Sequence, residues 1–149
     1  MPRRHYKTAR CILFREDRYL LADHHGTTSA RRKRHSKHRT RNAAGAIKWG
    51  LPGGHVEWRE KPADAARREL YEELNIHLGD MLSVGDYVYK QRLHAVFAAA
   101  SDVTEFELDF SELAAVRWFS AQEVKRLADF DQLHAGYEYD AIVALERLR

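Results

Sequence analysis

The sequence contains one cysteine and no apolar run long enough to cross a membrane. Cys11 alone cannot form an internal disulfide, so a disulfide-stabilised scaffold is excluded and the fold must depend on a packed core. Cys11 lies in an apolar segment, where we expect it to be a core residue. The amino terminus also lacks the apolar segment of a signal peptide. Together these absences predict a cytoplasmic protein without a membrane span.

Length and charge set further bounds. The 149 residues, 44% of them hydrophobic, suit one domain with a sizeable core. The formal net charge is +3, but the segment from Arg31 to Arg41 holds seven of the 25 Lys and Arg residues and no acid. The rest of the chain is therefore mildly acidic. This distribution argues against a general nucleic-acid-binding surface and for one local basic feature.

Apolar patterns predict two antiparallel pairs of strands and three helices. The strand pairs are expected at 6–15 with 18–23, and at 81–89 with 92–100. Shorter strands are expected at 49–57, interrupted by Leu51-Pro52-Gly53-Gly54, and at 116–119. Helices are expected at 62–74, 121–127 and 137–148. Pro62 suits a first helical turn, and Ser120 with Glu123 predicts a capping box. The chain is therefore expected to be a mixed α/β domain.

Residues 24–48 are predicted to form a long basic loop insert, because they lack aliphatic periodicity until Ile47. One interpretation is an arm that steers phosphates, for example those of RNA, since Arg and Lys neutralise phosphate without reading sequence. The alternative is a solvated insert with no fixed partner. The absence of interleaved aromatic residues for base stacking keeps both interpretations open.

Three glutamates gather on one flank of the helix predicted at 62–74. Glu69, Glu72 and Glu73 follow the i, i+3, i+4 spacing that brings side chains together on a helix. Like charges at this spacing are destabilising unless something offsets them. Arg67 and Arg68 are able to offset part of the charge. A divalent cation would offset it better, because Mg²⁺ and Mn²⁺ prefer carboxylate oxygens.

The run from Gly54 to Ile76 resembles the Nudix box of the MutT-like hydrolases. The charged positions of that motif are all present at their spacing: Glu60, Arg68, Glu69, Glu72 and Glu73. One position differs, since Asn75 stands where the family usually has glycine. We expect this residue to adopt a positive φ at the end of the helix, where asparagine is the best substitute. A plain solvated helix would not need the preceding Leu-Pro-Gly-Gly turn.

The resemblance implies an α/β Nudix fold, a mixed β-sheet sandwiched between α-helices, in a single domain over residues 1–149. It also implies Mg²⁺- or Mn²⁺-dependent hydrolysis of the pyrophosphate linkage in a nucleoside di- or triphosphate or a nucleotide derivative. A MutT-like nucleoside triphosphate is the default substrate. The implied metal ligands are Glu69, Glu72 and Glu73, with the Gly53 carbonyl and Glu57 as additional ligands.

The resemblance implies catalytic roles as well. Glu72 or Glu73 would orient or deprotonate the attacking water, and the choice between them stays open. Arg68 is expected to pair with a glutamate of the box, and Glu60 to support the geometry of loop and helix. For a further acid outside the box we select Glu112, which precedes the strand expected at 116–119. Glu105 and Glu107 are the alternatives.

Several other residues near the motif allow two interpretations. His24, His25 and His55 match no tight zinc spacing, so a histidine metal site is disfavoured. Trp49 and Trp58 flank the motif and are expected to pack more than to stack on a base. Tyr137 and Tyr139 are equally suited to lining a base pocket and to packing at the start of the last helix.

Two functions compete with a nucleotide hydrolase. The first is an RNA 5′-end pyrophosphohydrolase in which Arg31–Arg41 holds the chain, and steep salt dependence would distinguish it. The second is a regulatory module that binds nucleotides without catalysis. Such modules usually lose carboxylates of the box, whereas this chain keeps all of them. The sequence leaves the substrate and the oligomeric state open.

Overall fold

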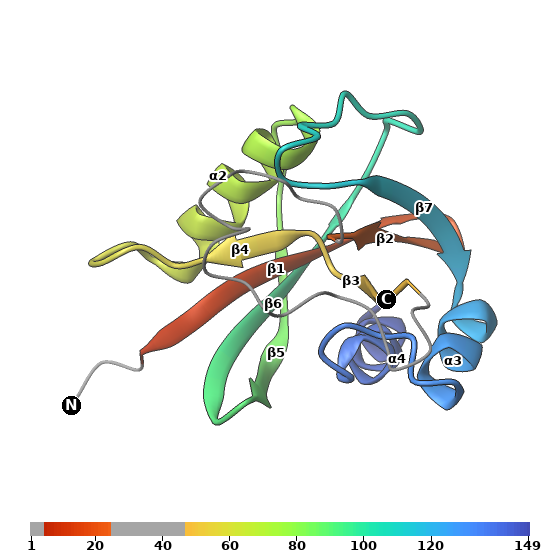
Figure 1. Ribbon diagram of the computed structural model, residues 1–149. Helices are drawn as coiled ribbons and strands as arrows, with labels where there is room; N and C mark the ends of the chain where they lie inside the picture. Colours follow the sequence, from red (N-terminus) through yellow and green to blue (C-terminus); the bar gives the residue numbers. More distant parts are fainter. Residues whose placement is uncertain (1–4, 25–46) are drawn as a thin grey trace.

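The computed structural model describes residues 5–24 and 47–149 (Figure 1). Within them a mixed sheet of seven strands lies between helices. The strands are β1 (Tyr6–Arg15), β2 (Arg18–Asp23), β3 (Trp49–Gly50), β4 (Gly53–His55), β5 (Leu82–Tyr89), β6 (Arg92–Ala100) and β7 (Ala115–Ser120). The helices are α2 (Pro62–Leu74), α3 (Ala121–Asp129) and α4 (Glu138–Leu148). The basic segment from Arg31 to Arg41 lies outside the described residues, so its interpretation stays a prediction.

Strand β1 organises the sheet. It pairs antiparallel with β2 at one end and with β4 at the other, and parallel with β6 along most of its length. The order β3-β2-β1-β6-β5 is extended by β7, which pairs with β2. Both predicted strand pairs, β1 with β2 and β5 with β6, are confirmed as antiparallel neighbours.

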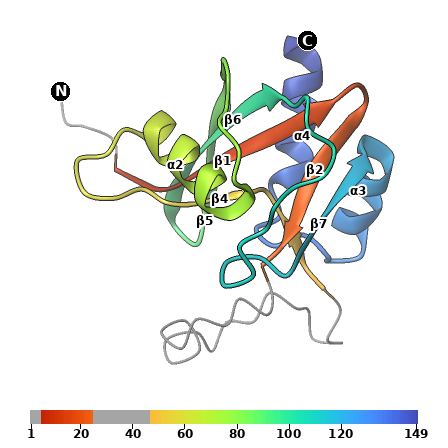
Figure 2. The same ribbon diagram turned by 90° about the horizontal axis from the view of Figure 1, so that it is seen from above.

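The two faces of the sheet carry separate cores, as Figures 1 and 2 show for α2 on one side and α3 with α4 on the other. Side chains alternate along a strand, so Cys11 and Leu13 face α2 while Ile12 faces α4. Leu70 of α2 and Ile142 of α4 are fully buried in these two cores. The predicted arrangement of a mixed sheet between helices is therefore confirmed. None of the helices in the described part of the chain is long and apolar enough to cross a bilayer.

Helix α2 begins and ends as the sequence predicts. Pro62 occupies its first turn, and Asn75 closes it in the left-handed conformation with φ 55°. The Asn75 side-chain amide donates a hydrogen bond to Glu107 at 2.9 Å, which anchors the loop that follows β6. Helix α3 starts at the predicted capping box of Ser120 and Glu123, and it continues to Asp129, two residues beyond the predicted end at 127.

The two tryptophans near the motif behave differently. Trp49 is 8% exposed and packs edge-on against Phe119, with ring centroids 5.2 Å apart, as predicted. The packing prediction is wrong for Trp58, which is 85% exposed. Trp58 lies in the turn between β4 and α2, where Arg59 has φ 63° and places its guanidinium 4.4 Å from the Trp58 ring centre. The turn directs this ring away from both cores.

Replacing Asn75 tests the left-handed helix end. Asn75→Ala and Asn75→Gly both remove the hydrogen bond to Glu107, but only alanine has a Cβ that strains a positive φ. We expect Asn75→Ala to be less stable than Asn75→Gly by about 1 kcal/mol. Urea unfolding followed by circular dichroism measures the difference. Equal stabilities would show that the backbone at residue 75 carries no strain.

Candidate active site

The loop between β3 and β4 fits between β1 and α2 only because it carries glycines. Gly53 has φ 140°, and a Cβ there would lie 2.3 Å from the Ala9 carbonyl oxygen. A Cβ on Gly54 would lie 2.4 Å from the carboxyl carbon of Glu69. Both contacts are much shorter than real Cβ contacts. The backbone of this loop is therefore pressed against β1 on one side and against the Glu69 carboxylate on the other.

Glu73 is the most buried acid of the box. Its side chain is 2% exposed, its Oε1 accepts a hydrogen bond from the Gly53 N–H at 2.8 Å, and its Oε2 lies 3.8 Å from Nδ1 of His24. Burial raises the pKa of Glu73 to about 8, although the charge of Arg10 and the Gly53 hydrogen bond act in the opposite direction. A cation bound at this carboxylate would displace its proton.

Arg68 holds the other carboxylates of the site. Its Nε and Nη2 donate to Glu60 at 2.9 and 3.0 Å, and its Nη1 lies 3.0 Å from Glu69 and 3.3 Å from Glu72. The predicted pairing of Arg68 with glutamates of the box is therefore present. The hydrogen bonds from Arg68 lower the pKa of Glu60, which also accepts the backbone N–H of Glu57. The Glu57 side chain lies further from Arg68, at 3.8 Å.

Of the three acids considered outside the box, Glu112 affects the site electrostatically. Burial raises the pKa of Glu69, and the negative charge of Glu112 contributes in the same direction for both Glu69 and Glu73. Glu107 instead accepts the Asn75 amide at the end of α2. Glu105 is exposed in the loop between β6 and β7. These positions favour Glu112 over its two alternatives.

The donor set suits a hard divalent cation. Glu69, Glu72 and Glu73 present carboxylate oxygens from one flank of α2, and Gly54 leaves the space in which the Glu69 carboxylate lies. Within residues 5–24 and 47–149, no three His, Cys, Asp or Glu side chains already form a metal-binding cluster; Arg68 lies among the carboxylates instead.

The Gly53 carbonyl is already engaged. It accepts a hydrogen bond from Nη1 of Arg10 at 2.8 Å, which leaves its second lone pair for another partner. The histidines show no zinc arrangement among the described residues: His24 lies beside Glu73, and the backbone carbonyl of His55 accepts from Arg68. His25 lies outside the described residues.

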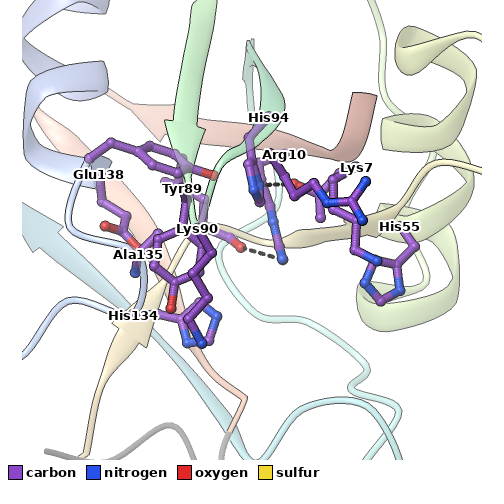
Figure 3. Close-up of a pocket in the computed structure, with 13 residues that line it drawn as sticks. Lys7, Arg10, His55, Tyr89, Lys90, His94, His134, Ala135 and Glu138 are labelled. Carbon is purple, nitrogen blue, oxygen red and sulfur yellow. Dashed lines mark hydrogen bonds between the residues drawn. The ribbon is translucent and has the colours of Figure 1, made fainter. Parts of the chain in front are cut away.

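A cavity of about 170 Å³ opens on the other side of the glycine loop (Figure 3). We call it the cationic cavity, because four of the described residues that line it are permanent cations. These are Lys7, Arg10, Lys90 and Arg92. Burial, followed by the charge of Arg10, lowers the pKa values of His94 and His134 to about 4, so both imidazoles are neutral at pH 7. Tyr137 also lines the cavity and stacks on Tyr87, with ring centroids 5.1 Å apart.

Arg10 connects the cavity to the carboxylates. Its Nη1 donates to the carbonyls of Leu51 and Gly53, and its charge acts on Glu73 as well as on the cavity histidines. Sequence analysis considered Tyr137 for a base pocket and His55 as a residue near the motif, but it did not select Arg10 or the other cavity residues. The only local signal was a charged residue inside the apolar strand that runs from Ala9 to Phe14. The neighbours that give Arg10 its position come from distant parts of the chain.

Comparison with known proteins agrees with this geometry. The NUDIX domain model matches residues 4–138. Diphosphoinositol polyphosphate phosphohydrolase 2 of Rattus norvegicus is 32% identical over 108 residues, which cover 68% of this chain and 55% of the relative. The chain thus spans about half the length of the curated relatives it matches.

Solved structures share the fold. A NUDIX-family hydrolase from Clostridium perfringens aligns with a TM-score of 0.68 at 18% identity, covering 99% of this chain and all of the other. A MutT NUDIX hydrolase from Burkholderia pseudomallei aligns with a TM-score of 0.57 at 24% identity, covering 80% of this chain and 86% of the other. The chain belongs to the NUDIX family, which confirms the resemblance seen in residues 54–76.

The buried position of Glu73 predicts how stability depends on pH in the metal-free protein. Its folded pKa of about 8 lies above that of the unfolded chain, so the folded state keeps a proton that the unfolded state loses. Stability is therefore expected to fall as pH rises from about 4.5 to 8. Glu73→Gln should remove this loss, and the variant should be more stable than the parent at pH 8.

Melting temperatures measured in EDTA between pH 5 and pH 8 test this expectation. Glu72→Gln is the control, because it removes the same charge from a half-exposed side chain of the same helix. A parent protein whose melting temperature declines no more steeply than that of Glu73→Gln would contradict the buried, proton-binding state of Glu73.

Proposed function

We propose that this chain is a pyrophosphohydrolase that requires Mg²⁺ or Mn²⁺ and cleaves a phosphoanhydride within a single domain. The observation that carries the proposal is the contact between the α2 carboxylates and the glycine loop. Gly54 has no side chain where Glu69 lies, and Gly53 donates its N–H to Glu73. Carboxylates held against an open backbone suit a cation that faces a phosphate chain.

The proposed metal ligands are those implied by the motif. Glu69, Glu72 and Glu73 would hold the cation, with Glu57 and the Gly53 carbonyl as additional ligands. When bound, the metal would neutralise phosphate oxygens as negative charge develops on them. Glu72 or Glu73 would orient or deprotonate the attacking water. The choice between these two glutamates as general base stays open.

Two further side chains complete the proposal. Arg68 would fix the positions of Glu60 and Glu69 through its fork of hydrogen bonds. Glu112 would add an acid from the loop before β7, where its charge already acts on Glu69 and Glu73. Both would serve to keep the carboxylates in position while the water attacks phosphorus.

A nucleoside triphosphate is the first substrate to test, as for MutT-like relatives. The aromatic rings of Tyr89 and Tyr137 beside the glycine loop are suited to contact a base. A second candidate is a substrate whose remaining part is itself highly phosphorylated. The name of the Rattus norvegicus relative, a diphosphoinositol polyphosphate phosphohydrolase, and the four cations of the cavity both favour it.

The third candidate is an RNA 5′-end pyrophosphohydrolase. It depends on Arg31–Arg41 and would be recognised by steep loss of affinity with salt. A regulatory module without catalysis is less well supported, because Glu60, Arg68, Glu69, Glu72 and Glu73 are all present.

Removing single carboxylates tests the proposal. We expect Glu72→Gln and Glu73→Gln each to lower turnover by about 10² or more, because a group that binds the metal or activates water is lost. Asp64→Asn is the matched control, since it removes the same charge from an exposed position on the same helix. It should leave turnover unchanged.

Phosphate and pyrophosphate release provides the measurement, with Mg²⁺ and with Mn²⁺. The panel should contain nucleoside triphosphates, dinucleoside polyphosphates, ADP-ribose, nucleotide sugars, diphosphoinositol polyphosphates and 5′-triphosphorylated RNA. Release that requires metal and disappears in Glu73→Gln supports the hydrolase. Release that persists in both variants, with their folding intact, would refute the proposed metal site.

A further inference from the structure

The cationic cavity brings together charge from segments that are distant in sequence. Lys7 and Arg10 come from β1, whereas Lys90 lies in the turn between β5 and β6 and Arg92 is the first residue of β6. Figure 3 shows Arg10, Lys7 and His94 around the same space, with Lys90 and His134 opposite. Four like charges around one cavity repel each other. Bringing them together is therefore unfavourable unless an anion occupies the space between them.

One carboxylate, that of Glu138, lines the cavity together with the four cations, and the charge of Arg10 acts on it. Glu138 is 1% exposed, and its two oxygens accept the backbone N–H groups of Ala135 and Gly136 at 2.8 and 2.7 Å. Burial raises the pKa of Glu138, while its backbone hydrogen bonds and the charge of Arg10 act in the opposite direction. These two hydrogen bonds give the Glu138 side chain a structural role at the start of α4. The cavity therefore retains a strong positive balance among its described residues.

The turn that supplies Lys90 and Arg92 has an unfavourable backbone. Lys90 and Gln91 have φ 49° and 63°, the two positive values of a tight two-residue hairpin turn. Asparagine and glycine adopt this conformation most easily, and a lysine there is strained. Tyr89 pairs with Arg92 across the turn, and Lys90 lies over the Tyr89 ring at 5.3 Å. This turn therefore places Lys90 and the adjoining Arg92 at the cavity.

Size and polarity limit the ligand. A volume of about 170 Å³ is similar to the ~150 Å³ cavities that bind benzene, so one small ring fits inside it. The neutral imidazoles of His94 and His134 provide hydrogen-bonding groups without adding charge. Thr8 contacts His94 through a hydrogen bond and fixes its ring. One ring with phosphate groups that reach the cations would satisfy these features.

Arg10 lies where such a ligand would meet the active site. Its backbone pairs with Gly53, and its side chain crosses that residue, because a Gly53 Cβ would lie 2.9 Å from the Arg10 Cδ. Nη1 is engaged with the carbonyls of Leu51 and Gly53. A guanidinium has five N–H donors, so its remaining donors are available to contact other groups, including the Tyr137 hydroxyl.

We propose that the cationic cavity binds phosphate groups that lie beyond the scissile diphosphate, and that Arg10 contacts the substrate between the two sites. This inference rests on the proposed hydrolase and names its substrate class: a compound that carries further phosphate groups in addition to the scissile diphosphate. The phosphates can belong to a phosphorylated ring or to a longer polyphosphate chain, since both present the same anionic oxygens to Lys and Arg.

Binding in EDTA tests the cavity separately from catalysis. The probes are myo-inositol hexakisphosphate for a phosphorylated ring, inorganic tripolyphosphate for a chain, and adenosine for a ring without phosphate. The variant Lys90→Gln/Arg92→Gln removes two cations from the cavity. Its matched control, Lys125→Gln/Arg126→Gln, removes one Lys and one Arg from exposed positions on α3. All proteins keep residues 31–41, so any contribution of that segment is the same in each.

We expect isothermal titration calorimetry to give a dissociation constant at least about tenfold higher for the cavity variant than for the control, with at least one phosphorylated probe. Side-chain NMR signals of His94 and His134 should shift when that probe binds the parent. The tighter of the two phosphorylated probes then distinguishes a ring from a chain. Equal constants for the two double variants, or binding of adenosine alone, would overturn the inference.

Failure of this inference differs from failure of the proposed function. Glu73→Gln should still bind the phosphorylated probe in EDTA while losing turnover. If Glu73→Gln keeps full turnover but the cavity variant loses binding, the hydrolase site is wrong and the anion site stands. If turnover requires Glu73 but the two double variants bind alike, the hydrolase stands and the cavity serves another part of the substrate.

Discussion

The close approach of the glycine loop to β1 is the constraint on which the site depends. Gly53 lies so near Ala9 and Arg10 that no side chain fits, and the pairing of β4 with β1 fixes this contact. From that position the Gly53 N–H reaches Glu73, and the space at Gly54 admits Glu69. The two acids of α2 are therefore positioned by backbone that belongs to the sheet.

Charge is separated on the two sides of that loop. Glu69, Glu72 and Glu73 lie toward α2, where Arg68 offsets part of their repulsion, and cations surround the cavity on the other side. Arg10 stands at the boundary and influences both Glu73 and His94. Such a division suits a reaction in which Lys and Arg side chains hold an anionic phosphate chain, while the carboxylates hold a dissociable metal cation.

Local patterns were sufficient for the elements and for the motif, because both depend on neighbours in sequence. The helix at 62–74, its end at Asn75 and the capping box at Ser120 all follow from residues within a few positions of each other. The packing prediction was wrong for Trp58, because no short-range pattern indicates in which direction the side chains of a turn point.

Most residues of the cationic cavity could not be predicted either, because short-range patterns do not show which distant segments come together. Thr8 and His94 meet because β1 runs parallel to β6, and that pairing joins segments more than eighty positions apart. Parallel pairing of this kind depends on the crossover between the strands and leaves no short-range signal. Glu112 was identified only through the resemblance, and its effect on Glu69 became visible once the loop before β7 was placed.

The pairing of β2 with β3 has a consequence for how this domain can diversify. Asp23 and Trp49 are partners across the two strands, so the chain leaves the sheet and returns to it at neighbouring positions. Closing a flexible loop between fixed ends becomes only ~0.6 kcal/mol less favourable for each doubling of its length. A change in the length of the connection from Asp23 to Trp49 therefore alters the free energy of loop closure very little, and the strand register around Gly53 does not depend on that length.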